Sequence, residues 1–166
     1  LSGATLVRAN LSGVDLSEAD LSEADLSRAN FYRATLSHAN LAGSNLTRCN
    51  LSGVDLSRAV LTRAVLTGSN LTRADLAGAD LNEADLTGTD LERADLALAD
   101  LTGADLTGSN LTAADLSYAT LARANLARVN LSGVDISRAN LSFANLAGSN
   151  LPRADLTLTD LNEADL

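Results

Sequence analysis

The sequence predicts an all-β solenoid with square coils, and three observations support this prediction. A leucine recurs at every fifth residue from Leu1 to Leu166, except that Phe31 and Ile136 replace it once each. A small residue stands two positions before each leucine, and Asp or Asn stands directly before almost every one. The choice between Asp and Asn repeats most regularly at intervals of twenty residues.

A period of five excludes the two common regular elements. In an α-helix, successive leucines would lie about 140° apart around the axis and would form no apolar stripe. In a plain strand, residues five apart point to opposite faces, because side chains alternate with a period of two. The remaining solution is a short extended piece followed by a corner in every pentad.

Each position of the pentad then has an expected place. The leucine and the small residue two before it (the small position) point inward, whereas the residue between them (the polar position) points outward. The two residues after the leucine (the first and second turn positions) make the corner. All eleven glycines and all twelve arginines occupy the second turn position, which suits unusual backbone angles and long outward side chains. We expect the centre of the core to be formed by Leu71, Leu76, Leu81, Leu86, Leu91, Leu96 and Leu101.

The polar position shows how many pentads complete one coil. Asn stands there at residues 10, 30, 50, 70, 110, 130 and 150, with Asp90 between them, whereas a spacing of fifteen mixes Asn and Asp. Four pentads therefore form one coil of twenty residues. Amides that hydrogen-bond to one another along the stack explain this Asn column structurally, and a binding role for the column is the alternative.

The pattern A(D/N)LXX resembles that of the pentapeptide repeat family along the whole chain. The resemblance implies a right-handed quadrilateral β-helix, a solenoid with four pentapeptides per coil. About eight coils at a β spacing of about 4.8 Å would form a rod roughly 40 Å long. We expect one domain spanning residues 1–166, because the coils of a solenoid contact only their neighbours.

The chain begins without Met and ends on a repeat leucine, so we expect it to be part of a longer protein. The regularity also suits a consensus-designed solenoid. We expect no membrane association, because no apolar run exceeds four residues, and we expect a cytoplasmic location. An uncapped terminal coil would offer unpaired backbone groups, which predicts an end-to-end homodimer.

Charge is segregated along the chain. Residues 28–73 carry six Arg against one Asp, a net charge of +5, whereas residues 75–115 carry eight Asp and two Glu against one Arg, a net charge of −9. The basic belt has no lysine and few aromatic residues, so we do not expect the rod to bind nucleic acid directly. The candidate interaction residues of the acidic belt are Asp75, Asp80, Asp85, Asp90, Asp95, Asp100 and Asp105.

Two interpretations of the acidic belt remain open. The first is a solvated surface that keeps a long stack soluble. The second is mimicry of nucleic acid, although the rod averages about one net charge per 4.4 Å whereas duplex DNA carries one per about 1.7 Å. The candidate apolar docking patch is separate from this belt: Leu98, Tyr118 and Leu158 share one column of second turn positions, and Phe143 lies on the next corner.

The sequence shows no catalytic or metal-binding constellation and implies no cofactor. His38 is alone at a corner, and Cys49 occupies an inward small position, so no Cys–His pair is expected. The repeated carboxylates lack the unlike environments that acid–base catalysis requires. We therefore do not expect an enzyme.

Three functions are compatible with these features of the sequence. The first is a non-enzymatic scaffold that presents charged belts and a small apolar patch to a protein partner. The second comes from the resemblance, because one branch of the family mimics DNA and modulates type II topoisomerases such as gyrase. That branch favours Phe at the leucine position and carries projecting loops, neither of which this chain shows. The third is a structural stalk or spacer.

Overall fold

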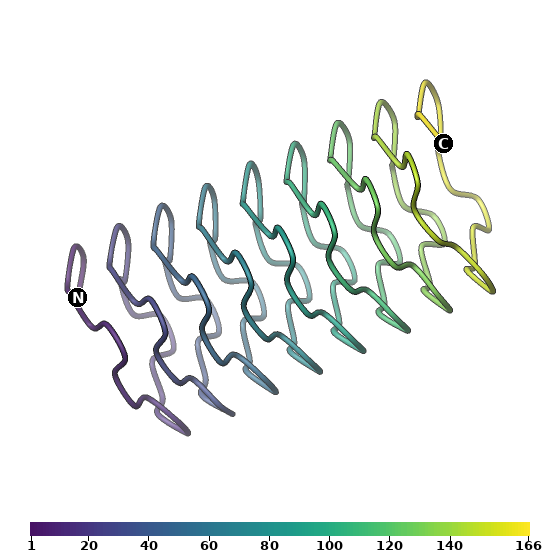
Figure 1. Ribbon diagram of the computed structural model, residues 1–166. Coiled ribbons are helices and arrows are strands. Elements are labelled where there is room, and N and C mark those ends of the chain that lie inside the picture. Colours follow the sequence, from purple (N-terminus) through teal and green to yellow (C-terminus); the bar gives the residue numbers. More distant parts are fainter.

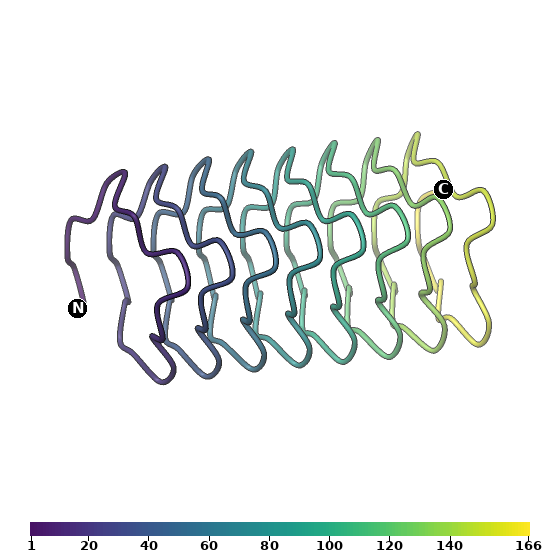
Figure 2. The ribbon, with the colours of Figure 1, turned by 90° about the horizontal axis from the view of Figure 1, so that it is seen from below.

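The computed structural model describes residues 1–166 and shows a stack of similar coils that follow one another along a single axis (Figures 1 and 2). No helix and no continuous strand forms, so no helix is present that could cross a membrane. The β structure consists of isolated parallel bridges at the polar positions, from Thr5↔Asp25 to Asn145↔Asp165. Every bridge joins residues twenty apart, which confirms the predicted register of four pentads per coil.

The bridges are single residues because each pentad leaves only a short extended piece between two turns. Within one pentad, the residue at the small position donates its N–H to the leucine carbonyl and closes a four-residue turn, as in Ala24 N to Leu21 O at 3.2 Å. The leucine and second turn position donate to the following coil, and the polar position donates to the preceding coil. Residues 21, 23 and 25 illustrate this with N–O distances of 2.7, 2.9 and 2.9 Å.

The second turn position is left-handed at every corner. Its φ lies between +53° and +70° whether the residue is glycine or not. The sequence predicted unusual angles for the glycines, but the structure places all twelve arginines in the same conformation. An L-residue in this region costs about 1–2 kcal/mol. The fold imposes the conformation because the N–H of this residue must reach the next coil.

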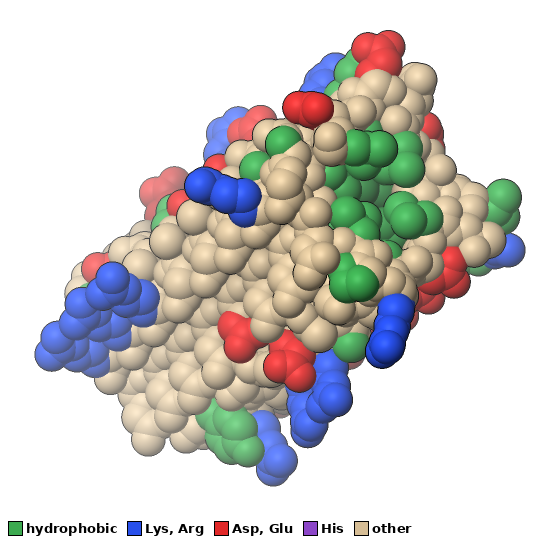
Figure 3. Space-filling model, turned by 45° about the vertical axis from the view of Figure 1, so that its right-hand side comes forward, with side chains coloured by type: hydrophobic (Ala, Val, Ile, Leu, Met, Phe, Trp, Pro, Cys, Tyr) green, Lys and Arg blue, Asp and Glu red, His purple; other side chains and the backbone are tan.

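The core is a continuous column of leucines and small residues inside the coils. The seven central leucines, from Leu71 to Leu101, are all fully buried. Burial is incomplete at the ends: Leu6, Leu11 and Leu16 are only half-buried, and Leu156 is exposed. Figure 3, in which the C-terminal end comes forward, shows hydrophobic side chains gathered toward that end.

One column of small positions carries most of the polar groups inside the core. Ser69 and Thr89 are buried and donate their hydroxyl hydrogens to the backbone oxygens of Leu46 and Leu86 at 2.6 and 2.7 Å. Cys49 lies in the same column, buried as predicted, with its sulfur 3.1 Å from the carbonyl oxygen of Leu26. Burial raises the pKa of this thiol to about 11, so it remains protonated at neutral pH.

Candidate interaction surface

The polar position accepts the last free backbone donor of most pentads. Four of the five N–H groups bond to other backbone carbonyls, and the fifth, at the first turn position, donates to the Oδ1 atom of the Asp or Asn two residues earlier. In the acidic belt this N–O distance is 2.9 Å for Asp75, 3.1 Å for Asp80, 2.9 Å for Asp85, 3.2 Å for Asp90, 2.9 Å for Asp95, 3.0 Å for Asp100 and 2.9 Å for Asp105. These carboxylates therefore support the turns as well as carrying charge.

This structural role was not predicted from the sequence, where the polar position was expected simply to face water. Only Asp75 and Asp95 of the seven are exposed, and the other five are half-buried. The signal was present in the sequence, because an Asp or Asn two residues before a turn N–H is the pattern of an Asx turn. Val60 and Val65 show the consequence of losing the acceptor. There the hydroxyls of Thr62 and Thr67 donate instead to carboxylates of the next coil, at 3.0 and 2.8 Å.

The Asn column forms a partial ladder, as the sequence predicted. The Nδ2 atom of Asn50 donates to Oδ1 of Asn30 at 3.0 Å, and Asn30 donates to Asn10 at 3.2 Å. The ladder resumes at Asn110, which donates to Asp90 at 3.0 Å. These contacts support the structural explanation of the column.

The seven candidate carboxylates encircle the rod and do not share one wall. Bridges pair Asp75 with Asp95, Asp80 with Asp100 and Asp85 with Asp105, and Asp90 lies on the fourth wall. A longer single-wall array does exist: consecutive bridges stack Asp55, Asp75, Asp95, Asp115, Asp135 and Asp155 on one wall, here called the acidic wall. A partner that contacts this wall meets the whole array and only part of the belt.

Hydrogen bonds hold several carboxylates in the ionised state. Burial acts to raise the pKa of Asp85, but the hydroxyl and N–H of Thr87 and the hydroxyl of Thr67 outweigh it, so the pKa lies below its usual value. For Asp100, burial again acts to raise the pKa, and the side chains of Thr102 and Asn82 outweigh it. Both carboxylates are therefore charged at neutral pH.

The structure places the four apolar candidates on the surface but separates them. Leu98 and Tyr118 lie on adjacent coils, with 68% and 50% of each residue exposed. Arg138 occupies the next coil of that column, donates a hydrogen bond to the Tyr118 hydroxyl, and stacks on its ring 5.2 Å from the centroid. Leu158 lies beyond this arginine with 74% exposed, and Phe143 projects from the next corner. The patch thus consists of one adjacent pair and two separate residues.

Few of the corner charges are paired. The ion pairs are Arg63 with Glu83 at 2.7 Å and Arg93 with Glu92 at 3.9 Å. No group of three or more His, Cys, Asp or Glu side chains is arranged to hold a metal ion. Nothing at the corners resembles a catalytic constellation.

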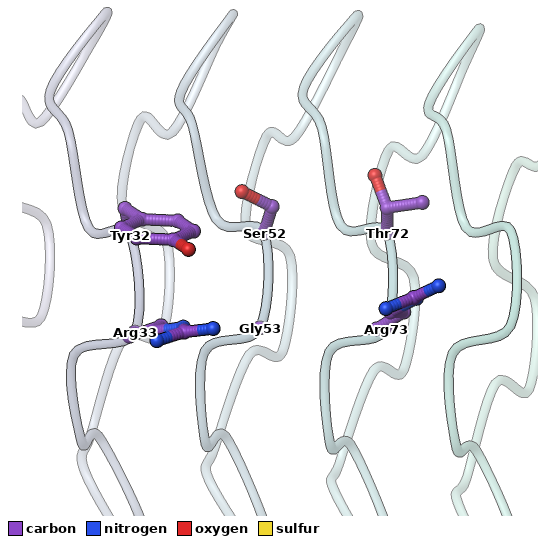
Figure 4. Close-up of a pocket in the computed structure, with 6 residues that line it drawn as sticks. All are labelled: Tyr32, Arg33, Ser52, Gly53, Thr72 and Arg73. Carbon is purple, nitrogen blue, oxygen red and sulfur yellow. The ribbon is translucent and has the colours of Figure 1, made fainter.

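Two shallow grooves interrupt the corners, and neither was predicted from the sequence. Each forms where a glycine at the second turn position lies between long side chains of the coils before and after it. One lies at Gly53 between Arg33 and Arg73 (Figure 4), and the other at Gly43 between Glu23 and Arg63. Comparing second turn positions twenty residues apart would have located both glycines, whereas the direction of the neighbouring side chains, which decides whether a groove forms, is visible only in the structure. Of the two aromatic residues near the basic belt, Phe31 is buried in the core and Tyr32 lines the first groove.

The family model for pentapeptide repeats, in eight copies, matches residues 1–31, 29–68, 69–108, 109–142 and 139–166. The chain is a pentapeptide repeat protein. Among solved structures, this pentapeptide repeat protein is similar to HetL, which is involved in heterocyst differentiation regulation, from the cyanobacterium Nostoc sp. strain PCC 7120. The two share 40% identity with a TM-score of 0.84, over 100% of this chain and 78% of HetL.

Two further structures are also similar. Rfr23 from the cyanobacterium Cyanothece 51142 is 30% identical with a TM-score of 0.54, over 73% of this chain and 90% of that one. QnrB1, a plasmid-mediated fluoroquinolone resistance protein, is 19% identical with a TM-score of 0.43, over 96% of this chain and 91% of that one. This last similarity is too low to bear on function. No curated protein sequence matches the chain.

Proposed function

We propose that this pentapeptide repeat protein is a non-enzymatic interaction scaffold, a right-handed rod of about eight coils that presents its corners to a protein partner. One observation carries the proposal: the leucine, small and polar positions are engaged in the core or in turn hydrogen bonds. The two turn positions alone are free to vary, and they carry every arginine and the four apolar candidates. Function therefore belongs to side chains spaced along the outside of the rod, the corner residues and the charged belts, and not to a closed cavity.

The similarity to HetL supports a regulatory role of this kind, because HetL is involved in the regulation of heterocyst differentiation and matches the whole of this chain at 40% identity. Under this proposal the rod is cytoplasmic. Under the same proposal, the incompletely buried leucines of the terminal coils pack together in an end-to-end homodimer.

The scaffold function is tested by capturing partners from the source cell with two variants. Asp80, Asp85, Asp95 and Asp100 are changed together to Asn, which removes four charges but keeps the Oδ1 acceptors of the turns. Leu98→Ser with Tyr118→Ser removes the adjacent apolar pair. The proposal expects at least one variant to lose a partner that the native rod captures while remaining folded. Identical capture by the native rod and both variants would refute the proposed surfaces.

A second function, mimicry of DNA toward a type II topoisomerase, is favoured by the acidic wall. Six carboxylates follow one another there at about 4.8 Å per coil, a regular anionic row on one side of the rod. Duplex DNA is denser, with one charge per about 1.7 Å of axis. A mimic should inhibit gyrase supercoiling at low salt and lose this effect as salt is raised. No inhibition and no protection from quinolones at low salt would eliminate this function.

A further inference from the structure

The groove at Gly53 lies between two arginines of the same corner, whose side chains both lean toward the C-terminal end of the rod (Figure 4). Arg33 and Arg73 occupy the second turn positions one coil before and one coil after Gly53, and Tyr32 lines the groove beside Arg33 (Figure 4). A Cβ atom at Gly53 would lie 3.6 Å from Cγ of Arg33. Because glycine has no side chain, the space beside the aliphatic part of Arg33 stays open. The open volume is about 230 Å³.

The donors of this groove have no acceptor within the protein. Neither Arg33 nor Arg73 forms an ion pair, and the phenol of Tyr32 makes no hydrogen bond, in contrast to the Tyr118 phenol. Arg33 instead stacks on the ring of Tyr32, with its guanidinium 5.1 Å from the ring centroid. This stacking holds the positive charge of Arg33 beside the groove.

The other polar groups of the groove are already engaged. The hydroxyls of Ser52 and Thr72 donate to the side-chain oxygens of Asn50 and Asn70 on the adjoining wall. They turn away from the groove, as Figure 4 shows, so the free donors are the two guanidiniums and the phenol.

The two walls that meet at this corner differ in charge. The adjoining wall carries the neutral amides of Asn30, Asn50 and Asn70 at this level, and its opposite corner carries Arg28 and Arg48. The wall on the other side of this corner is the acidic wall, and two of its carboxylates stand two residues after Gly53 and Arg73. They are Asp55 and Asp75, which accept the N–H groups of Ser57 and Ala77 and form no ion pair with the arginines.

We propose that this groove binds a phosphate group, held by the guanidiniums of Arg33 and Arg73 with the Tyr32 hydroxyl as a third donor. Two guanidiniums match a dianionic phosphate in charge, and their planar arrays of N–H groups match its oxygens. The groove is open to solvent, so we expect a weak site, with a dissociation constant of about 1 mM at low salt. The phosphate can be a free ion or part of a phosphorylated peptide.

The second groove supplies the internal control. It has the same construction around Gly43, but its two corner side chains are of opposite charge, and Arg63 is engaged by Glu83 at 2.7 Å. The same arrangement of backbone and glycine therefore occurs without free cationic donors. A phosphate that recognised only the shape of a corner would bind both grooves.

The test follows the Nε–H signals of the arginines by NMR while inorganic phosphate, or separately a phosphoserine peptide, is added at low salt and about pH 7.5, where phosphate is largely dianionic. The signals of Arg33 and Arg73 should shift and saturate, whereas the signal of Arg63 should not. Arg33→Gln and Arg73→Gln should each weaken binding by about tenfold, and Arg63→Gln should leave it unchanged. Thermal unfolding midpoints of the three variants confirm that each folds.

The results distinguish the sources and can refute the site. Equal affinity for both probes identifies a site for free phosphate, and tighter binding of the peptide than of its unphosphorylated form and of free phosphate identifies a phosphorylated partner. The proposal is wrong if no signal saturates, if all exposed arginines shift alike, or if Arg63→Gln weakens binding as much as Arg73→Gln.

Discussion

Replacing Asp100 by Ala tests whether the belt carboxylates support the turns. The Oδ1 atom of Asp100 accepts the N–H of Thr102 at 3.0 Å and its hydroxyl at 2.6 Å. A hydrogen bond contributes about 0.5–1.5 kcal/mol net, and Asp100 is half-buried. We therefore expect Asp100→Ala to lower the free energy of unfolding by about 1–2 kcal/mol. Urea unfolding followed by far-UV circular dichroism measures this difference.

Asp100→Asn is the matched control, because it keeps an Oδ1 acceptor and removes the charge. Its unfolding free energy should stay within about 0.5 kcal/mol of the native value. Hydrogen exchange at the Thr102 amide should accelerate in the Ala variant and not in the Asn variant. Equal destabilisation by both substitutions would show that charge matters and the acceptor does not. Native stability in both would show that the turn hydrogen bond contributes nothing.

Three further predictions concern the backbone, pH and the thiol. Ala113→Gly should raise the free energy of unfolding, measured in urea, by about 0.5–1 kcal/mol, because Ala113 has a φ of 56° and glycine adopts this angle without strain. Gly88→Ala should lower it by a similar amount for the same reason, although no atom lies within 4 Å of the added Cβ. The pKa of Asp85 is lowered from 3.8 in the folded state. The ionised carboxylate therefore contributes its full share of stability above about pH 5, and this share is lost as the pH falls through the folded pKa. In Asp85→Asn, the melting temperature should fall less steeply below about pH 4 than in the native protein. Burial raises the pKa of the Cys49 thiol to about 11, so Cys49 should not react with a thiol reagent at about pH 7 in the folded protein. In urea it should react fully. Rapid labelling of the folded protein would show that the core opens at this position.

The candidate site was only partly predictable from sequence. The positions of Leu98 and Tyr118 on adjacent coils follow from their spacing of twenty, and both are exposed. That Arg138 covers Tyr118 and separates it from Leu158 depends on rotamers, which spacing does not specify. The groove at Gly53 depends on the direction in which the corner side chains lean, and only coordinates show that direction.

The amino-acid sequence by itself determined the period, the core and the register. A leucine every fifth residue is incompatible with a helix or a plain strand, so a corner in every pentad follows from side-chain geometry, and the column of Asn residues fixes twenty residues per coil. The tertiary structure decided what each outward side chain does. Asp100 and its equivalents became turn acceptors, and arginines were held at positive φ, because stacking of the coils gives nearly all backbone N–H groups a partner.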